Sequence, residues 1–182
     1  MTYLFAVLFF VVSIIARSIP HIPNMAPIGA LALWSGAYLP KRWGWMLPIA
    51  AMFLSDWAQG FYSWKLMVVV YGSFALYSFI GWSLRVRQDP LRFVTATIGA
   101  STAFFLVTNF AVWSFSNWYP HSTSGLLWAY TLGLPFFRNT LLGDLGYTVL
   151  LFGAYQFVVT HSSVARISYS HVLKNSRVEV VS

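Results

Sequence analysis

Two aspartates lie inside apolar stretches that are long enough to cross a lipid bilayer. Asp56 and Asp144 are two of the four carboxylate side chains in the sequence, and Arg17 and Arg138 lie at or near the ends of other apolar stretches. An ionised side chain near the bilayer centre costs roughly 2.5–3.5 kcal/mol on insertion scales, so it normally faces a partner, a cavity or a ligand. These four residues are therefore the first candidates for a functional site.

The composition is that of an integral membrane protein. Of the 182 residues, 58% are hydrophobic and 8% are charged, and the mean hydropathy is +0.67. A chain of this length has room for about six spans of roughly 20 residues each. The sequence contains no cysteine, which excludes disulfides and thiolate chemistry. We therefore predict an all-α integral membrane protein, built as a six-transmembrane-helix bundle.

Six apolar segments are the predicted spans. They cover residues 3–18, 26–39, 45–62, 66–84, 93–118 and 135–159. The first segment has no basic region before it and no small-residue cleavage site, so we predict a retained helix rather than a signal peptide. In this prediction, residues 1–160 form the membrane domain and residues 161–182 form a polar cytoplasmic tail.

The basic residues predict the orientation of these spans. Most of them follow the second, fourth and sixth segments, namely Lys41, Arg42, Arg85, Arg87, Arg92, Arg166, Lys174 and Arg177. Because cytoplasmic loops carry the excess of lysine and arginine, both termini are predicted to be cytoplasmic, in a bacterial cytoplasmic (inner) membrane. The net charge of +7 is then a topology signal and an attraction to anionic lipid. We predict the lipid bilayer as a partner, and no nucleic acid.

On these boundaries, three polar side chains lie at a similar depth. At 1.5 Å per residue, Asp56, Asn109 and Asp144 each lie about eight or nine residues below the external end of a different helix. We therefore predict a cavity that opens to the outside and binds a small-molecule solute. Its predicted floor comprises Asp56, Asn109, Trp113 and Asp144. Its predicted mouth comprises Arg17, Asn24, Arg138 and Asn139, where arginine can hold an anionic group with two hydrogen bonds.

Helical spacing and loop composition extend this prediction. Gln59 shares a helix face with Asp56, and Thr140 shares one with Asp144. Residues 119–134 are predicted to be the longest external loop, containing an interfacial helix or a lid, and Pro135 suits the first turn of the last helix. Small residues at three- and four-residue steps in the second segment predict close helix packing, within the bundle in preference to a second protein.

Other functions remain open for the same residues. The two aspartates can pair with Arg17, Arg138 or helix N-terminal amides and lock the bundle, as in a structural membrane subunit. Two aspartates on different helices also resemble an intramembrane aspartyl protease, whose carboxyl groups share a proton. Leu141 stands where the Gly-x-Gly-Asp motif of that enzyme has glycine, so this alternative is less favoured. No nucleotide-binding loop or metal-ligand motif occurs, and we predict a binding protein without a cofactor or a metal site.

Three strings carry a resemblance to a known family. They are Arg-Ser-Ile-Pro-His-Ile-Pro-Asn at 17–24, Ser-Asp-Trp-Ala-Gln-Gly at 55–60, and Leu-Pro-Phe-Phe-Arg-Asn-Thr-Leu-Leu-Gly-Asp-Leu at 134–145. They resemble an uncharacterised family of bacterial transport-class membrane proteins, which is similar to the substrate-binding S components of energy-coupling factor transporters. The resemblance implies a six-helix bundle that takes up a vitamin-like, small organic or metal solute from outside. It also implies a transmembrane coupling protein and cytoplasmic ATPases as partners, which would hydrolyse the ATP.

Overall fold

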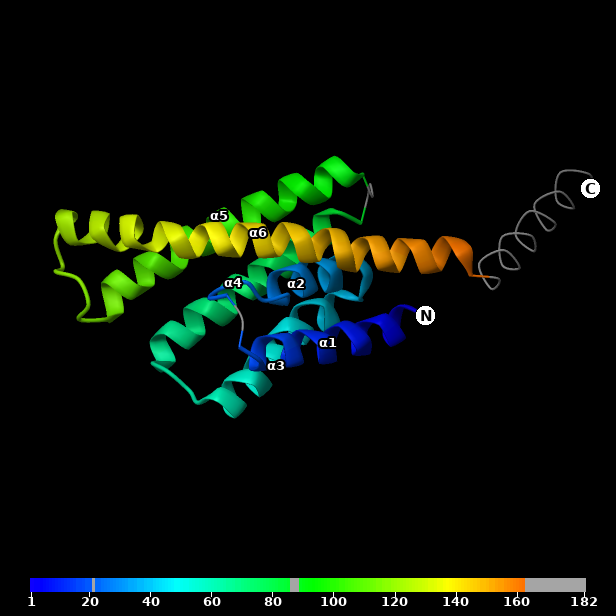
Figure 1. Cartoon of the computed structure of the whole chain (residues 1–182), viewed down its shortest axis with the longest axis horizontal. Coiled ribbons are helices and arrows are strands. Elements are labelled where there is room, and N and C mark those ends of the chain that lie inside the picture. The colour runs from blue at the N-terminus through cyan, green and yellow to red at the C-terminus, as the bar shows by residue number, and fades with distance from the viewer. Residues whose placement is uncertain (21, 86–88, 163–182) are drawn as a thin grey trace, which may run out of the picture.

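The structure is a computed structural model, and it describes residues 1–20, 22–85 and 89–162. These residues form six helices and no strands (Figure 1), which confirms the prediction of an all-helical chain. In chain order the helices are α1 Thr2–Ser18, α2 Ile28–Tyr38, α3 Lys41–Gln59, α4 Trp64–Ser83, α5 Pro90–Phe115 and α6 Thr123–His161. Nearly all of the predicted cytoplasmic tail, from residue 163 onward, lies outside the described residues.

Three helices are long and apolar enough to cross a membrane: α4, α5 and α6. The apolar helices α1 and α2 are shorter, with 17 and 11 residues. The bundle exposes many large apolar side chains; for example, Leu4, Val68 and Val149 keep 72%, 63% and 68% of their surface exposed. A water-soluble monomer rarely exposes such extensive apolar surface. The structure therefore has the helices and the surface of a membrane protein.

The shortest helix, α2, occupies the centre of the bundle. Every residue from Ile28 to Ala37 is buried, and α2 contacts each of the other five helices. The sequence of α2 is apolar on all sides, as expected for a helix that is enclosed by protein. At a rise of 1.5 Å per residue, α2 is about 16 Å long, which is roughly half of the hydrocarbon thickness of a bilayer. Both ends of α2 therefore lie inside the protein.

Glycines allow α2 and α4 to approach each other closely. A Cβ atom added at Gly36 would lie 2.0 Å from the carbonyl oxygen of Ser78. One added at Gly81 would lie 2.2 Å from the carbonyl oxygen of Leu33. No side chain fits into contacts this short, so the two backbones meet directly. The small residues of the second segment thus pack within the bundle, as predicted.

Arg85 closes the C-terminal end of α2. Its Nε donates a 3.0 Å hydrogen bond to the carbonyl oxygen of Gly36, and its Nη2 donates to the carbonyl oxygen of Leu39. The last carbonyl groups of a helix lack intrahelical donors and carry partial negative charge. The guanidinium group of Arg85 supplies both the hydrogen-bond donors and the positive charge that these carbonyl groups lack. Arg85 therefore stabilises the end of α2, in addition to its predicted role as one of the basic residues that orient the chain.

The start of α6 differs from the prediction. The helix begins at Thr123 rather than at Pro135, and it includes most of the predicted external loop of residues 119–134. The side chain of Ser122 accepts a hydrogen bond from the backbone N–H of Gly125 and caps the helix at that point. Pro135 lies inside the helix. An internal proline removes one backbone hydrogen bond, and the neighbouring helices of a bundle can compensate for this loss. The prediction of a long loop here was wrong.

The two ends of the described chain lie at the same end of the bundle (Figure 1). Thr2 Oγ1 lies 2.9 Å from the hydroxyl oxygen of Tyr155, and the ring of Phe5 packs edge-on against Tyr155. The beginning of α1 therefore contacts the last third of α6. The opposite end of the bundle carries residues 22–27 before α2 and the connections 60–63 and 116–122 (Figure 1).

We expect the α2–α4 contact to be sensitive to a single methyl group. Gly81→Ala should lower the free energy of unfolding by about 1–3 kcal/mol, because the added Cβ would overlap the backbone of α2. Gly72→Ala is the matched control on the same helix, since a Cβ there meets nothing within 4 Å. Thermal unfolding in detergent measures both variants. Equal melting temperatures for the two would contradict the close approach.

Candidate functional site

A cavity of about 510 Å³ lies at the end of the bundle that carries the three connections. All six helices contribute to its wall, and so does each of the connections 19–27, 60–63 and 116–122. Its volume falls within the range of small-molecule binding sites. Its polar lining includes Arg17, Asn24, Gln59, Tyr62, Thr108, Asn109, Thr140 and Asp144, and its aromatic lining includes Phe74, Phe104, Trp118, Tyr119 and Phe136.

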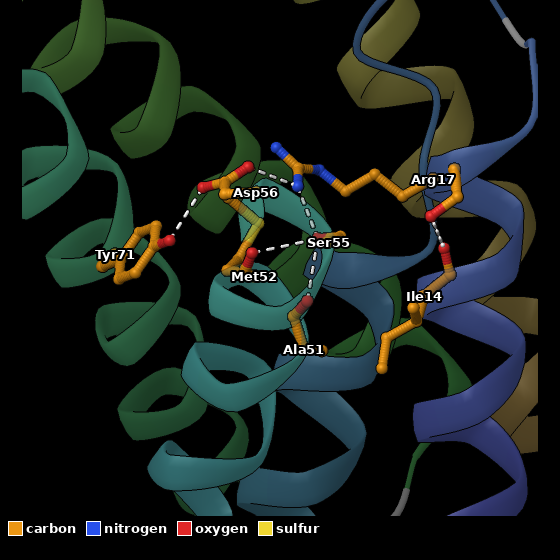
Figure 2. Close-up of polar contacts among 8 residues, drawn as sticks. Ile14, Arg17, Ala51, Met52, Ser55, Asp56 and Tyr71 are labelled. Atoms are coloured by element: carbon orange, nitrogen blue, oxygen red, sulfur yellow. Dashed lines mark hydrogen bonds and ion pairs between the residues drawn. The ribbon is translucent and has the colours of Figure 1, made fainter. Parts of the chain in front are cut away.

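Arg17 and Asp56 form an ion pair beside this cavity (Figure 2). Arg17 Nη1 lies 2.6 Å from Asp56 Oδ1 and also donates a hydrogen bond to Ser55 Oγ. The hydroxyl group of Tyr71 donates a 2.7 Å hydrogen bond to Asp56 Oδ2. Each oxygen of the carboxylate therefore has a partner, and the network joins α1, α3 and α4. Arg17 lines the cavity, whereas Asp56 lies behind it.

The placement of Asp56 corrects the predicted floor of the cavity. The predicted third span continues to residue 62, which would put Asp56 well below the membrane surface. In the structure, α3 ends at Gln59, because Gly60 has a φ of 102° and terminates the helix. Asp56 therefore lies in the last turn of α3, level with the end of α1 that carries Arg17. It acts as the counter-ion that positions Arg17.

Tyr62 lies at the same corner of the cavity. Partial burial raises the pKa of its hydroxyl group to about 12, and the nearby Asp56 carboxylate adds to this rise. The hydroxyl group consequently stays protonated at physiological pH. Because Tyr62 lines the cavity, this group can donate a hydrogen bond to a bound molecule.

Asp144 lies in the buried part of the cavity wall, with 3% of its surface exposed. Its Oδ2 accepts two hydrogen bonds of 2.7 Å, one from the hydroxyl group of Tyr77 and one from that of Ser101. These contacts join α4, α5 and α6. Within the described part of the chain, Oδ1 accepts no hydrogen bond. This oxygen atom lies against Gly29, which also lines the cavity, so one acceptor atom of a buried carboxylate has no described donor there.

Asp144 also lies at the N-terminal turn of the central helix. A Cβ atom added at Gly29 would be only 2.2 Å from Asp144 Oδ1, so glycine is required where the carboxylate meets α2. The first backbone N–H groups of a helix lack intrahelical acceptors, and this end of a helix favours negative charge. The depth of Asp144 in the last predicted span makes it a candidate, but its place at the start of α2 has no signal in the sequence.

Two amides complete the predicted residues that line the cavity. Asn109 Nδ2 donates a 2.8 Å hydrogen bond to the carbonyl oxygen of Phe105, and its Oδ1 lies close to Gly133 of α6. Asn24 has a φ of 62°, a left-handed conformation that asparagine tolerates better than most residues. The structure thus brings together half of the predicted site: Arg17, Asn24, Asn109 and Asp144.

The other half of the predicted site does not line the cavity. Trp113 Nε1 donates a hydrogen bond to the carbonyl oxygen of Pro120, and Asn139 Nδ2 donates one to the carbonyl oxygen of Pro23. Each side chain therefore holds a connecting segment against a helix. Arg138 is exposed, and no described carboxylate pairs with it. Because α6 begins at Thr123, well before Pro135, Arg138 lies in the interior of the helix and not at its start beside the mouth. The residues outside the cavity wall are Asp56, Trp113, Arg138 and Asn139.

Helical spacing predicted part of the lining, and other members had no clear signal. Gln59 and Thr140, predicted to share helix faces with the two aspartates, both line the cavity. Thr108 and Tyr119 were missed, since neither position differs from an ordinary packing or loop residue in the sequence. Within the described residues, no group of three or more His, Cys, Asp or Glu side chains could hold a metal ion.

We expect Asp56→Asn to destabilise the bundle by about 3 kcal/mol, because it leaves the Arg17 guanidinium without its buried counter-ion. Asp89→Asn is the matched control: Asp89 caps α5 from an exposed position, and asparagine caps a helix equally well. Thermal unfolding in detergent measures both changes. A variant at position 56 as stable as the control would show that the ion pair contributes nothing to the fold.

Comparisons with known proteins give a family and no nearer relative. No match was found among the curated proteins, and none among the solved structures. Residues 1–167 match the family described as "Family of unknown function (DUF6580)". This match covers most of the 182 residues. The chain therefore belongs to the DUF6580 family.

Proposed function

We propose that this protein is a membrane component that binds a small-molecule solute in the cavity between its six helices. The observation that carries this proposal is the available Oδ1 of Asp144 in the wall of a 510 Å³ cavity. A buried carboxylate is costly unless hydrogen bonds and charges around it are complete. A bound solute would complete them. Arg17, Asn24 and Asn109 would supply further polar contacts.

The proposal places all six helices in a bacterial cytoplasmic membrane, with both termini in the cytoplasm. The exposed apolar side chains would then face lipid, and the buried α2 would need no contact with it. Lys41 and Arg42 begin α3 at the end of the bundle opposite the cavity. Positive charge is favoured on the cytoplasmic side, so the cavity would open to the outside.

The absence of cysteine from the sequence makes this topology directly testable. We expect single cysteines at Ser63 and Asn117 to react with a membrane-impermeant maleimide in intact cells, because six spans put both connections outside. A cysteine at Arg42 should react only after the membrane is permeabilised. All three positions are exposed. If the cysteines at 42 and 63 react equally in intact cells, α3 does not cross the membrane and the six-span topology is wrong.

We further propose that the protein serves solute uptake with partner subunits. The three sequence strings resemble an uncharacterised transport-class family that is similar to S components, and this resemblance supports the step. It would require a transmembrane coupling protein and cytoplasmic ATPases. The chain has no nucleotide-binding loop of its own. ATP hydrolysis would therefore belong to the partners, and the chain would act as the binding component.

A structural membrane subunit is the second candidate. The observation that favours it is the Arg17–Asp56–Tyr71 network, in which both carboxylate oxygens of Asp56 have partners and three helices are joined. The open atom of Asp144 favours binding instead. A protease-like enzyme has less support, because catalytic aspartates must share a proton, whereas Asp56 and Asp144 contact different partners.

Filling the cavity tests the binding function. We expect native mass spectrometry of gently purified protein to detect a retained small molecule, and we expect Gly133→Leu to remove it. Gly133 lines the cavity, and a side chain there would project toward Asn109. Gly153→Leu is the matched control on the exposed face of α6, where a Cβ meets nothing within 4 Å. Protein that retains lipid only, in all three forms, would favour the structural subunit.

A further inference from the structure

The two charged side chains that line the cavity in the described residues are in different electrostatic situations. Arg17 is already balanced, because the Asp56 carboxylate lies 2.6 Å from its Nη1. Asp144 has two neutral hydrogen-bond donors, Tyr77 and Ser101, and no described cationic side chain pairs with it. The cavity therefore has one carboxyl group that no described cationic side chain contacts.

The open atom of Asp144 specifies what a ligand must supply. Tyr77 and Ser101 both contact Oδ2, whereas Oδ1 lies against Gly29, which also lines the cavity, and accepts no hydrogen bond from a described residue. A ligand group that satisfies Oδ1 as an acceptor must donate a hydrogen bond to it. A group that also neutralises the carboxylate must be positively charged. A protonated amine does both, and charge-assisted hydrogen bonds of this kind are about twice as strong as neutral ones.

The walls next to Asp144 are aromatic. Phe74 and Phe104 line the cavity, with ring centroids 5.2 Å apart. The ring of Tyr77, which holds Asp144, packs 5.7 Å from that of Phe74. Aromatic faces attract cations and pack well against flat apolar groups. This surrounding suits a ligand with an apolar or aromatic body beside its charged group.

From these observations we propose that the cavity binds an organic amine, with its protonated amino group at Asp144 Oδ1 and its apolar body against Phe74 and Phe104. This inference rests on the proposed function, since it names the ligand class of the same cavity. A carboxylate on the ligand is not required: it would have to compete with Asp56 for Arg17.

Three indole compounds that differ in one charged group test the ligand class. The probes are tryptamine, which is cationic, indole-3-propionate, which is anionic, and 3-ethylindole, which is neutral. We expect tryptamine to bind the detergent-purified wild-type protein about tenfold or more tightly than the other two, measured by native mass spectrometry and by the rise in melting temperature. Equal binding of the three, preference for the acid, or no binding of tryptamine would overturn the inference. This comparison requires no variant.

Substitution of the carboxylate then tests the assigned atom. Asp144→Asn should weaken tryptamine binding by about tenfold or more, and Asp144→Glu should restore part of it. Asp89→Asn should bind as the wild type does. Tryptamine binding that is unchanged in Asp144→Asn would contradict the assignment. A neutral or acidic solute that is retained and then lost in Gly133→Leu would leave the binding function intact and refute only the amine; no solute and no probe bound would refute both.

Discussion

Helix α2 is a helix of 11 residues that contacts the other five described helices, and ten of its residues are buried. Each end is met by an oppositely charged side chain from another part of the chain. Asp144 lies at the first turn, and Arg85 donates to the carbonyl groups of the last turn. This pairing matches the helix dipole at both ends. The glycine contacts with α4 and the packing of the remaining helices depend on α2 staying in this position.

The length of α2 also explains why a cavity exists. A helix of about 16 Å fills roughly half of the bilayer thickness, and the described residues between α1 and α2, 19–20 and 22–27, are not helical. The space beyond the start of α2 is bounded by side chains of all six helices rather than filled by one of them. Asp144 therefore has two roles. Its carboxyl group lies at the first turn of α2, and it also lines the cavity, where it can contact a bound molecule.

The sequence predicts the helices better than it predicts their ends. Apolar length identifies all six helices, but Ser122 and Gly60, which set the limits of α6 and α3, are small residues that resemble many others. These two errors shifted Arg138 and Asp56 from their predicted places. Asp144 and Asn109, which the sequence makes candidates, both line the cavity. Strongly polar side chains in apolar helices need polar surroundings. The hydrogen bonds of Trp113 and Asn139 to connecting segments depend on the conformation of those segments, which apolar periodicity does not predict.

The separation of Asp144 from α2 along the chain has a consequence for biogenesis. A helix of 11 residues is too short to be recognised as a span by itself during membrane insertion, so α2 would enter together with a neighbouring helix. Its N-terminal turn receives its carboxylate from α6, the last of the six described helices. The start of α2 therefore reaches its final arrangement only after α6 has been made. A chain that ends before Asp144 would therefore leave the start of α2 without its carboxylate.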